Sequence, residues 1–139
     1  MRRAVLLGCE LDPTLFPESD MSKAATSVVV FGGYLVILGI GLIVAPALVL
    51  APFGFAAPTE VWIHVLGVVV TTLGVYYVQM ARANVVPFFH ATVLLRPVVF
   101  VAFVAFVLIG WAPVPLALFG AVDAAGAAWT WWALRGDAA

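Results

Sequence analysis

Long apolar runs separated by short polar interruptions make up most of the chain beyond its first 25 residues. Four of these runs have about 20 residues or more, the length that a helix needs to cross a hydrocarbon core about 30 Å thick. The alternation of apolar and polar residues that an outer-membrane barrel requires is absent. Because the connections are short, successive helices are expected to lie side by side and antiparallel, and the pattern predicts one all-α domain, a four-helix antiparallel transmembrane bundle. Its helices are expected at about 26–50, 61–81, 86–110 and 114–134.

Composition supports lipid as the solvent. Of the 139 residues, 65% are hydrophobic and 9% are charged, whereas soluble domains are about half apolar and a quarter charged. The expected partner is therefore the lipid bilayer, and a net charge of −1 gives no reason to expect nucleic acid. The single cysteine, Cys9, can form no internal disulfide and argues against a metal cluster. We expect no metal and no cofactor.

The positions of the basic residues predict the orientation of the helices. The loops 51–60 and 111–113 contain no Lys or Arg, so the positive-inside rule places both termini in the cytoplasm. The chain is then a multi-pass protein of the cell inner (plasma) membrane. Five of the six basic residues share the cytoplasmic side: Arg2, Arg3, Lys23, Arg82 and Arg135.

The first 22 residues differ from the rest and are expected to form a flexible cytoplasmic tail before a transmembrane domain over 23–139. Two alternatives stay open. Cys9 follows LLG, as in a lipoprotein signal, although the apolar stretch 4–8 is shorter than the roughly 7 to 15 residues of such a signal. Met21 is an alternative start, because it leads directly into the first helix.

Small residues indicate how the first helix packs. Gly33, Ile37 and Gly41 lie on one face at four-residue steps, and this face is expected to let another helix approach closely. It is also where we would expect a homo-oligomer or a membrane-protein partner to dock. Pro46 is expected to kink the helix near its outer end.

Two ionisable residues lie deep within the predicted spans. Such groups cost about 2.5 to 3.5 kcal/mol to insert and usually face the interior of a bundle. Arg96 and Asp123 are each about 15 Å from the cytoplasmic ends of neighbouring antiparallel helices, so an ion pair with two parallel hydrogen bonds is expected. Either this pair fixes the register of the two helices, or Arg96 binds an anion and Asp123 is its resting counter-ion.

Other polar residues form two further groups. Glu60 and His64 are one turn apart at the outer end and are expected to form a polar pair, with His64 as a pH-responsive group. At the cytoplasmic end, polar side chains are expected to form a funnel that descends towards Asp123, and its members are Tyr76, Tyr77, Gln79, Arg82, Asn84 and His90. The predicted binding set combines this funnel with the buried charges: Arg96, Asp123, His90, Tyr77, Arg82, Thr92 and Thr130.

The segments GVYYVQMARANVVPFFHATVLLRP and APVPLALFGAVDAAGAAWTWWAL resemble a family of small bacterial four-helix inner-membrane proteins of unknown function. The similarity covers roughly residues 60 to 134 and implies the same fold. The layout is also similar, more distantly, to that of DoxX-like and BphX-like membrane proteins. Neither resemblance implies an activity. The matching positions include Tyr76, Tyr77, Arg82, Pro87, Phe88, Phe89, Thr92, Arg96, Gly120 and Asp123.

Three functions remain after the known catalytic motifs are found to be absent. The first is a non-enzymatic structural or accessory subunit, because no recognised catalytic set is present. The second is binding or transport of a small amphiphile, lipid or anion through a polar cavity at Arg96. The third is an intramembrane enzyme that acts on a lipidic substrate through Asp123 and His90.

Overall fold

The computed structural model describes residues 21–56 and 58–137, and this part of the chain is helical without any strand. The predicted all-α class is therefore confirmed, and each predicted apolar run contains one long helix. The elements are α1 (Lys23–Val44), α2 (Pro46–Leu50), the 3-10 helix η2 (Ala51–Phe53), α3 (Trp62–Arg82), α4 (Val86–Leu108) and α5 (Leu116–Asp137).

The predicted tail over 1–22 lies outside the described residues except for its last two, and Cys9 lies outside them as well. Ser22 belongs to the fold, because its hydroxyl accepts a hydrogen bond from the Ala25 N–H and caps α1.

Three helices are long and apolar enough to cross a membrane, namely α1, α3 and α4. This indicates a membrane protein. Helix α5 has 22 residues and is as long as the others. It is less apolar than α1 and α4, and Asp123, Arg135 and Asp137 lie within it.

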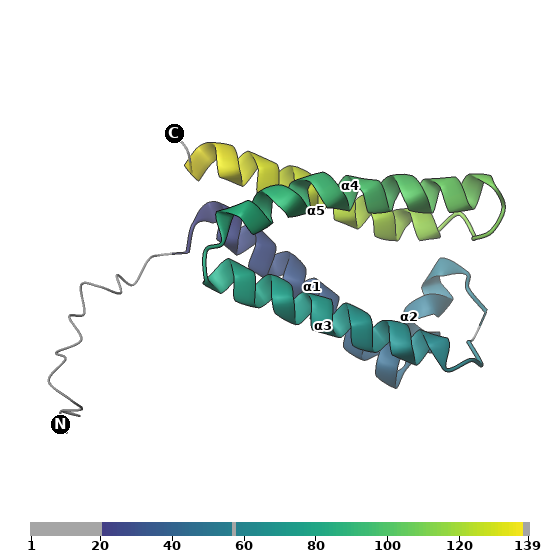
Figure 1. Ribbon diagram of the computed structural model, residues 1–139. Coiled ribbons are helices and arrows are strands. Elements are labelled where there is room, and N and C mark those ends of the chain that lie inside the picture. Colours follow the sequence, from purple (N-terminus) through teal and green to yellow (C-terminus); the bar gives the residue numbers. More distant parts are fainter. Residues whose placement is uncertain (1–20, 57, 138–139) are drawn as a thin grey trace, which may run out of the picture.

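The long helices form two antiparallel hairpins, α1 with α3 and α4 with α5 (Figure 1). The hairpins converge at the end that holds the start of α1 and the end of α5, and they diverge towards the other end. Helix α1 also packs against α5, whereas α3 and α4 share few contacts although they are consecutive. The expectation that successive helices lie side by side is thus confirmed within each hairpin and is wrong for α3 and α4.

Glycines bring the backbones of α1 and α3 into contact. A Cβ atom at Gly74 would lie 2.7 Å from the carbonyl oxygen of Gly32, and one at Gly67 would lie 2.8 Å from that of Gly39. Gly32 and Gly39 are seven residues apart on α1, and Gly67 and Gly74 are seven residues apart on α3, so both contacts lie on the same face of each helix. The predicted face of Gly33 and Ile37 does not pack against another helix of the chain, because Gly33 has nothing within 4 Å of its Cβ position and Ile37 is 75% exposed. That an oligomer or a partner docks there stays a prediction.

The predicted kink at Pro46 is a complete break. Helix α1 ends at Val44, and Ala45 leaves the helical conformation with φ −145° and ψ 61°. Pro46 then starts α2. At the first position of a helix the backbone N–H has no hydrogen-bond partner within the helix, so a proline there costs no hydrogen bond. The turn brings Phe53 of η2 against Phe119 of α5, with ring centroids 4.3 Å apart, so η2 bridges the hairpins at their diverging end.

Candidate functional site

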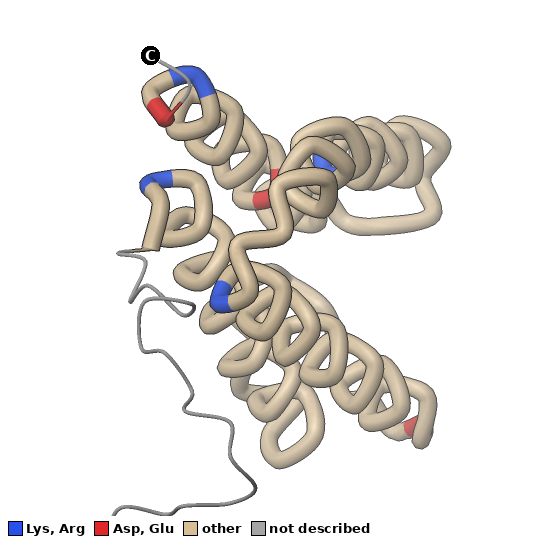
Figure 2. The backbone as a smooth tube through the Cα atoms, turned by 60° about the vertical axis from the view of Figure 1, so that its left-hand side comes forward, with Lys and Arg blue, Asp and Glu red and all other residues tan. Residues whose placement is uncertain are grey.

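Hydrogen bonds hold three chain segments together where the hairpins converge. The Asp137 carboxylate at the end of α5 accepts from the backbone N–H groups of Lys23 at 3.2 Å and Ala24 at 2.9 Å. Ser22 donates to the side-chain oxygen of Asn84, in the turn between α3 and α4, at 2.9 Å. Figure 2 shows basic residues in blue at the helix ends of this region. Lys23 starts α1, and Arg82 and Arg135 lie in the last turns of α3 and α5.

The side chain of Arg96 on α4 lies inside this junction and is 2% exposed. Its guanidinium carbon is 3.5 Å from the centre of the Phe31 ring of α1 and 5.2 Å from that of Tyr77 of α3. Nη1 makes a long hydrogen bond of 3.5 Å to the Thr130 hydroxyl of α5. Arg96 therefore touches all four long helices and is stabilised chiefly by aromatic faces.

Two hydroxyl groups connect the Arg96 guanidinium to α1 through Thr130 of α5. Thr130 donates to the Gly126 carbonyl at 2.9 Å, and Ser27 lies 3.0 Å from the Thr130 oxygen. A Cβ atom at Gly126 would lie 3.0 Å from Arg96 Nη1 and 3.2 Å from the Phe31 ring. The guanidinium therefore fits because α5 has a glycine beside it.

The predicted ion pair between Arg96 and Asp123 is not formed. The Nε and Nη2 atoms of Arg96 have no hydrogen-bond partner among residues 21–56 and 58–137, so a two-bond pair with a carboxylate is excluded in this structure. Asp123 is half-buried on α5 and stays within electrostatic range of Arg96 without contacting it.

Helix geometry explains why equal depth does not produce contact. The close approach of Gly120 to Phe100 sets the register of α4 and α5, which puts Arg96 and Asp123 nearly level, as predicted. Side chains on a helix tilt towards its N-terminus, and the N-termini of antiparallel helices point in opposite directions. The Arg96 side chain therefore extends towards the converging end, whereas that of Asp123 tilts the other way.

The predicted funnel at the cytoplasmic end is also not formed, because most of its members face outward. Arg82 and His90 are exposed. Tyr77 is buried against Arg96, and Thr92 is buried but donates to the Phe89 carbonyl of its own helix at 2.9 Å. Of the predicted binding set, the structure brings together Arg96, Tyr77 and Thr130. The sequence analysis missed Phe31, Ser27 and Gly126.

The predicted pair of Glu60 and His64 is replaced by another contact. The His64 ring Nδ1 lies 2.8 Å from the Ile43 carbonyl oxygen near the end of α1, and Glu60 is exposed in the bend before α3. The Ile43 carbonyl lies in the last turn of α1, where carbonyl oxygens accept no hydrogen bond from their own helix and are free to bond a side chain. Within the described part of the chain, no three metal-ligating side chains come together.

Three adjacent hollows lie along the α1–α5 contact, with volumes of about 520, 350 and 250 Å³ from the converging end outward. Trp129 lines the first and the second, and Tyr34 and Val122 line the second and the third. The hollows therefore form one groove, called here the α1–α5 groove. Arg96, Asp123 and His90 do not line it.

Comparison of the chain with protein-family models, with curated proteins and with solved structures finds no match. The resemblance carried by the helix-spanning segments therefore remains a prediction.

Proposed function

We propose that this chain is a small multi-pass protein of the bacterial inner membrane that acts as a non-enzymatic structural or accessory subunit. All four long helices cross the bilayer in this proposal. Helix α5 crosses with α4 because the two are antiparallel, similar in length and packed together. The basic helix ends and both termini then lie in the cytoplasm.

The observation that carries the proposal is the closed environment of Arg96. A cation that serves a substrate needs a path to it, yet Arg96 is 2% exposed and does not line the α1–α5 groove, although it contacts Phe31 and Gly126, which do. Its contacts join α1, α3, α4 and α5, which supports a role in fixing how the two hairpins meet. Buried polar groups are known to act in this way in some proteins.

The surfaces of α3 and α4 favour an accessory role. Large apolar side chains on these helices face outward, among them Val69 at 58%, Leu94 at 73% and Val101 at 65% exposure. In a bilayer these faces contact lipid or another membrane protein. The enzyme alternative has less support, because Asp123 and His90 do not line the groove that a substrate would enter.

Two experiments test the proposal. Single cysteines introduced at positions 84 and 111, in a chain without Cys9, should react with a membrane-impermeant maleimide from opposite sides of the membrane. The accessory role predicts that Arg96→Gln and Asp123→Asn act mainly on folding or partner assembly, which is measured as the amount of folded protein and as assembly on native gels. If both variants keep normal expression and assembly but abolish a transport or enzymatic activity, the accessory role is wrong.

A further inference from the structure

We propose that the α1–α5 groove binds one anionic phospholipid of the surrounding bilayer. Its phosphate lies at Lys23, and one acyl chain follows the groove towards Phe53. The groove adjoins the Arg96 junction, because Ser27, Phe31 and Gly126 line its second hollow. The proposal rests on the proposed membrane topology and does not depend on the accessory role.

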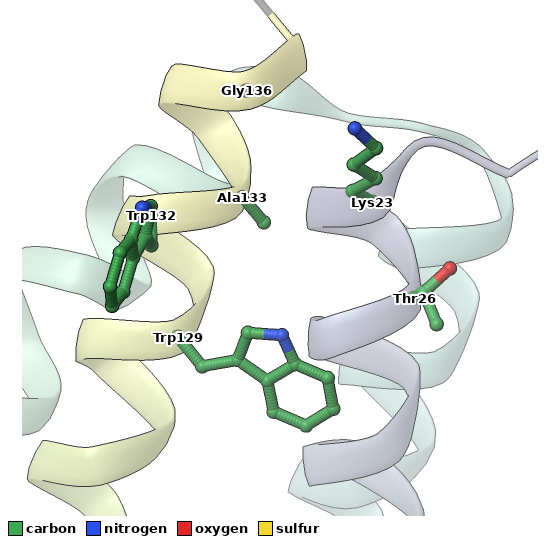
Figure 3. Close-up of a pocket in the computed structure, with 6 residues that line it drawn as sticks. All are labelled: Lys23, Thr26, Trp129, Trp132, Ala133 and Gly136. Atoms are coloured by element: carbon green, nitrogen blue, oxygen red, sulfur yellow. The ribbon is translucent and has the colours of Figure 1, made fainter.

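The converging end of the groove has the chemistry of a head-group site (Figure 3). Lys23 extends from the start of α1 towards the end of α5, and the Trp129 indole lies across the gap one level deeper. The small residues Ala133 and Gly136 of α5 leave the hollow of about 520 Å³ open here. A lysine and an indole at this depth match the interface of a bilayer, where cations and indoles meet phosphate and glycerol groups.

The rest of the groove has the chemistry of an acyl-chain site. Val30, Tyr34 and Ala125 line the second hollow, and Leu38 and Phe53 are among the side chains that line the third. From Lys23 to Leu38, α1 rises about 22 Å at about 1.5 Å per residue. This length exceeds the half-thickness of about 15 Å of the hydrocarbon core, so the groove can hold one whole lipid chain.

The charges at the groove favour an anionic over a zwitterionic head group. Lys23 is the single charged residue among those that line the three hollows. The nearby Asp137 carboxylate is directed to the backbone N–H groups of Lys23 and Ala24, and the Arg135 guanidinium lies 3.9 Å above the Trp131 ring. The Lys23 ammonium is therefore the group that a phosphate would meet.

Native mass spectrometry of the full chain in mild detergent tests this proposal, with equal amounts of phosphatidylglycerol and phosphatidylcholine added. The wild type should retain one phosphatidylglycerol in preference. Lys23→Gln should weaken that binding about fivefold, the contribution of one lysine beside an anionic lipid. Arg82→Gln is the matched control, because it removes an exposed cation at the same end but outside the groove.

A second pair of variants tests the acyl-chain path. Ala125→Phe fills the middle of the groove and should reduce retention of both lipids. Ala105→Phe, at an exposed alanine of α4 away from the groove, should not. Equal retention of the two lipids by the wild type would overturn the proposal, as would unchanged binding in Lys23→Gln and Ala125→Phe. A dimer that Ala125→Phe disrupts would assign the groove to a second copy of the chain instead.

Discussion

The contact between α1 and α3 makes a sharp prediction about two glycines of one helix. In Gly39→Ala, the new Cβ would collide with the Thr71 hydroxyl and lie 2.7 Å from the Gly67 carbonyl oxygen. Gly33→Ala is the matched control, because its Cβ would meet nothing within 4 Å. The carbonyl oxygen belongs to the backbone of α3, so relief at Gly39 requires the two helices to separate.

The size of the effect follows from two opposing contributions. Overpacking of a close contact costs about 1 to 3 kcal/mol, whereas replacing glycine by alanine inside a helix gains about 1 kcal/mol. The second contribution is common to both variants and cancels when they are compared. Gly39→Ala should therefore be less stable than Gly33→Ala by about 1 to 3 kcal/mol, and Gly33→Ala should match or exceed the wild type.

Equilibrium unfolding measures this difference. The purified chain in mild micelles is titrated with a denaturing detergent, and helicity is followed by circular dichroism together with tryptophan fluorescence. Gly74→Ala should behave like Gly39→Ala, because its Cβ would lie 2.7 Å from the Gly32 carbonyl oxygen. Equal midpoints for Gly33→Ala and Gly39→Ala would refute the packing described for α1 and α3.

Three further predictions concern the junction and the turns. Arg96→Met should leave stability in the same unfolding assay unchanged or slightly raised, because the roughly 2.5 to 3.5 kcal/mol cost of a buried charge outweighs a cation–π contact of about 2 kcal/mol. Arg96→Lys should lower it, because the charge remains while the planar stacking on Phe31 is lost; the reverse order would contradict the account of the junction. Gly110→Ala should cost about 1 to 2 kcal/mol, because Gly110 has a φ of +79°, and Gly136→Ala, which meets nothing within 4 Å, serves as its control. Asp137→Ala should cost about 1 kcal/mol and speed hydrogen exchange at the amides of Lys23 and Ala24, so unchanged exchange there would argue against the bonds to the carboxylate.

Hydropathy predicted the long helices well because each must bury its backbone hydrogen bonds within one continuous apolar segment. It could not predict the break at Ala45, because proline allows either a kink or a new helix start and tertiary contacts decide between them. Nor could it choose between Gly32 and Gly33 as the contact residue on α1. Both are glycines, and only the crossing of α3 distinguishes their faces.

For the candidate site, residue counting along the helices predicted that Arg96 lies level with Asp123 but did not predict which residues contact Arg96. The level of Arg96 with Asp123 follows from rise per residue, which is nearly constant. The direction of each side chain depends on helix polarity and rotation, and these turned Arg96 towards Phe31 and Thr130. The small size of Gly126 was a usable signal, because a glycine on a helix face often marks a close neighbour.

The bond between the first helix and the end of the last one sets an order of assembly during synthesis. Asp137 leaves the ribosome 114 residues after Lys23, which takes about 6 to 23 seconds at the usual rate of translation. During that interval the N–H groups of Lys23 and Ala24 lack the Asp137 carboxylate that later accepts their hydrogen bonds. The start of α1 is therefore secured only after the end of α5 has been made, and a truncation that removes Asp137 would weaken the start of α1.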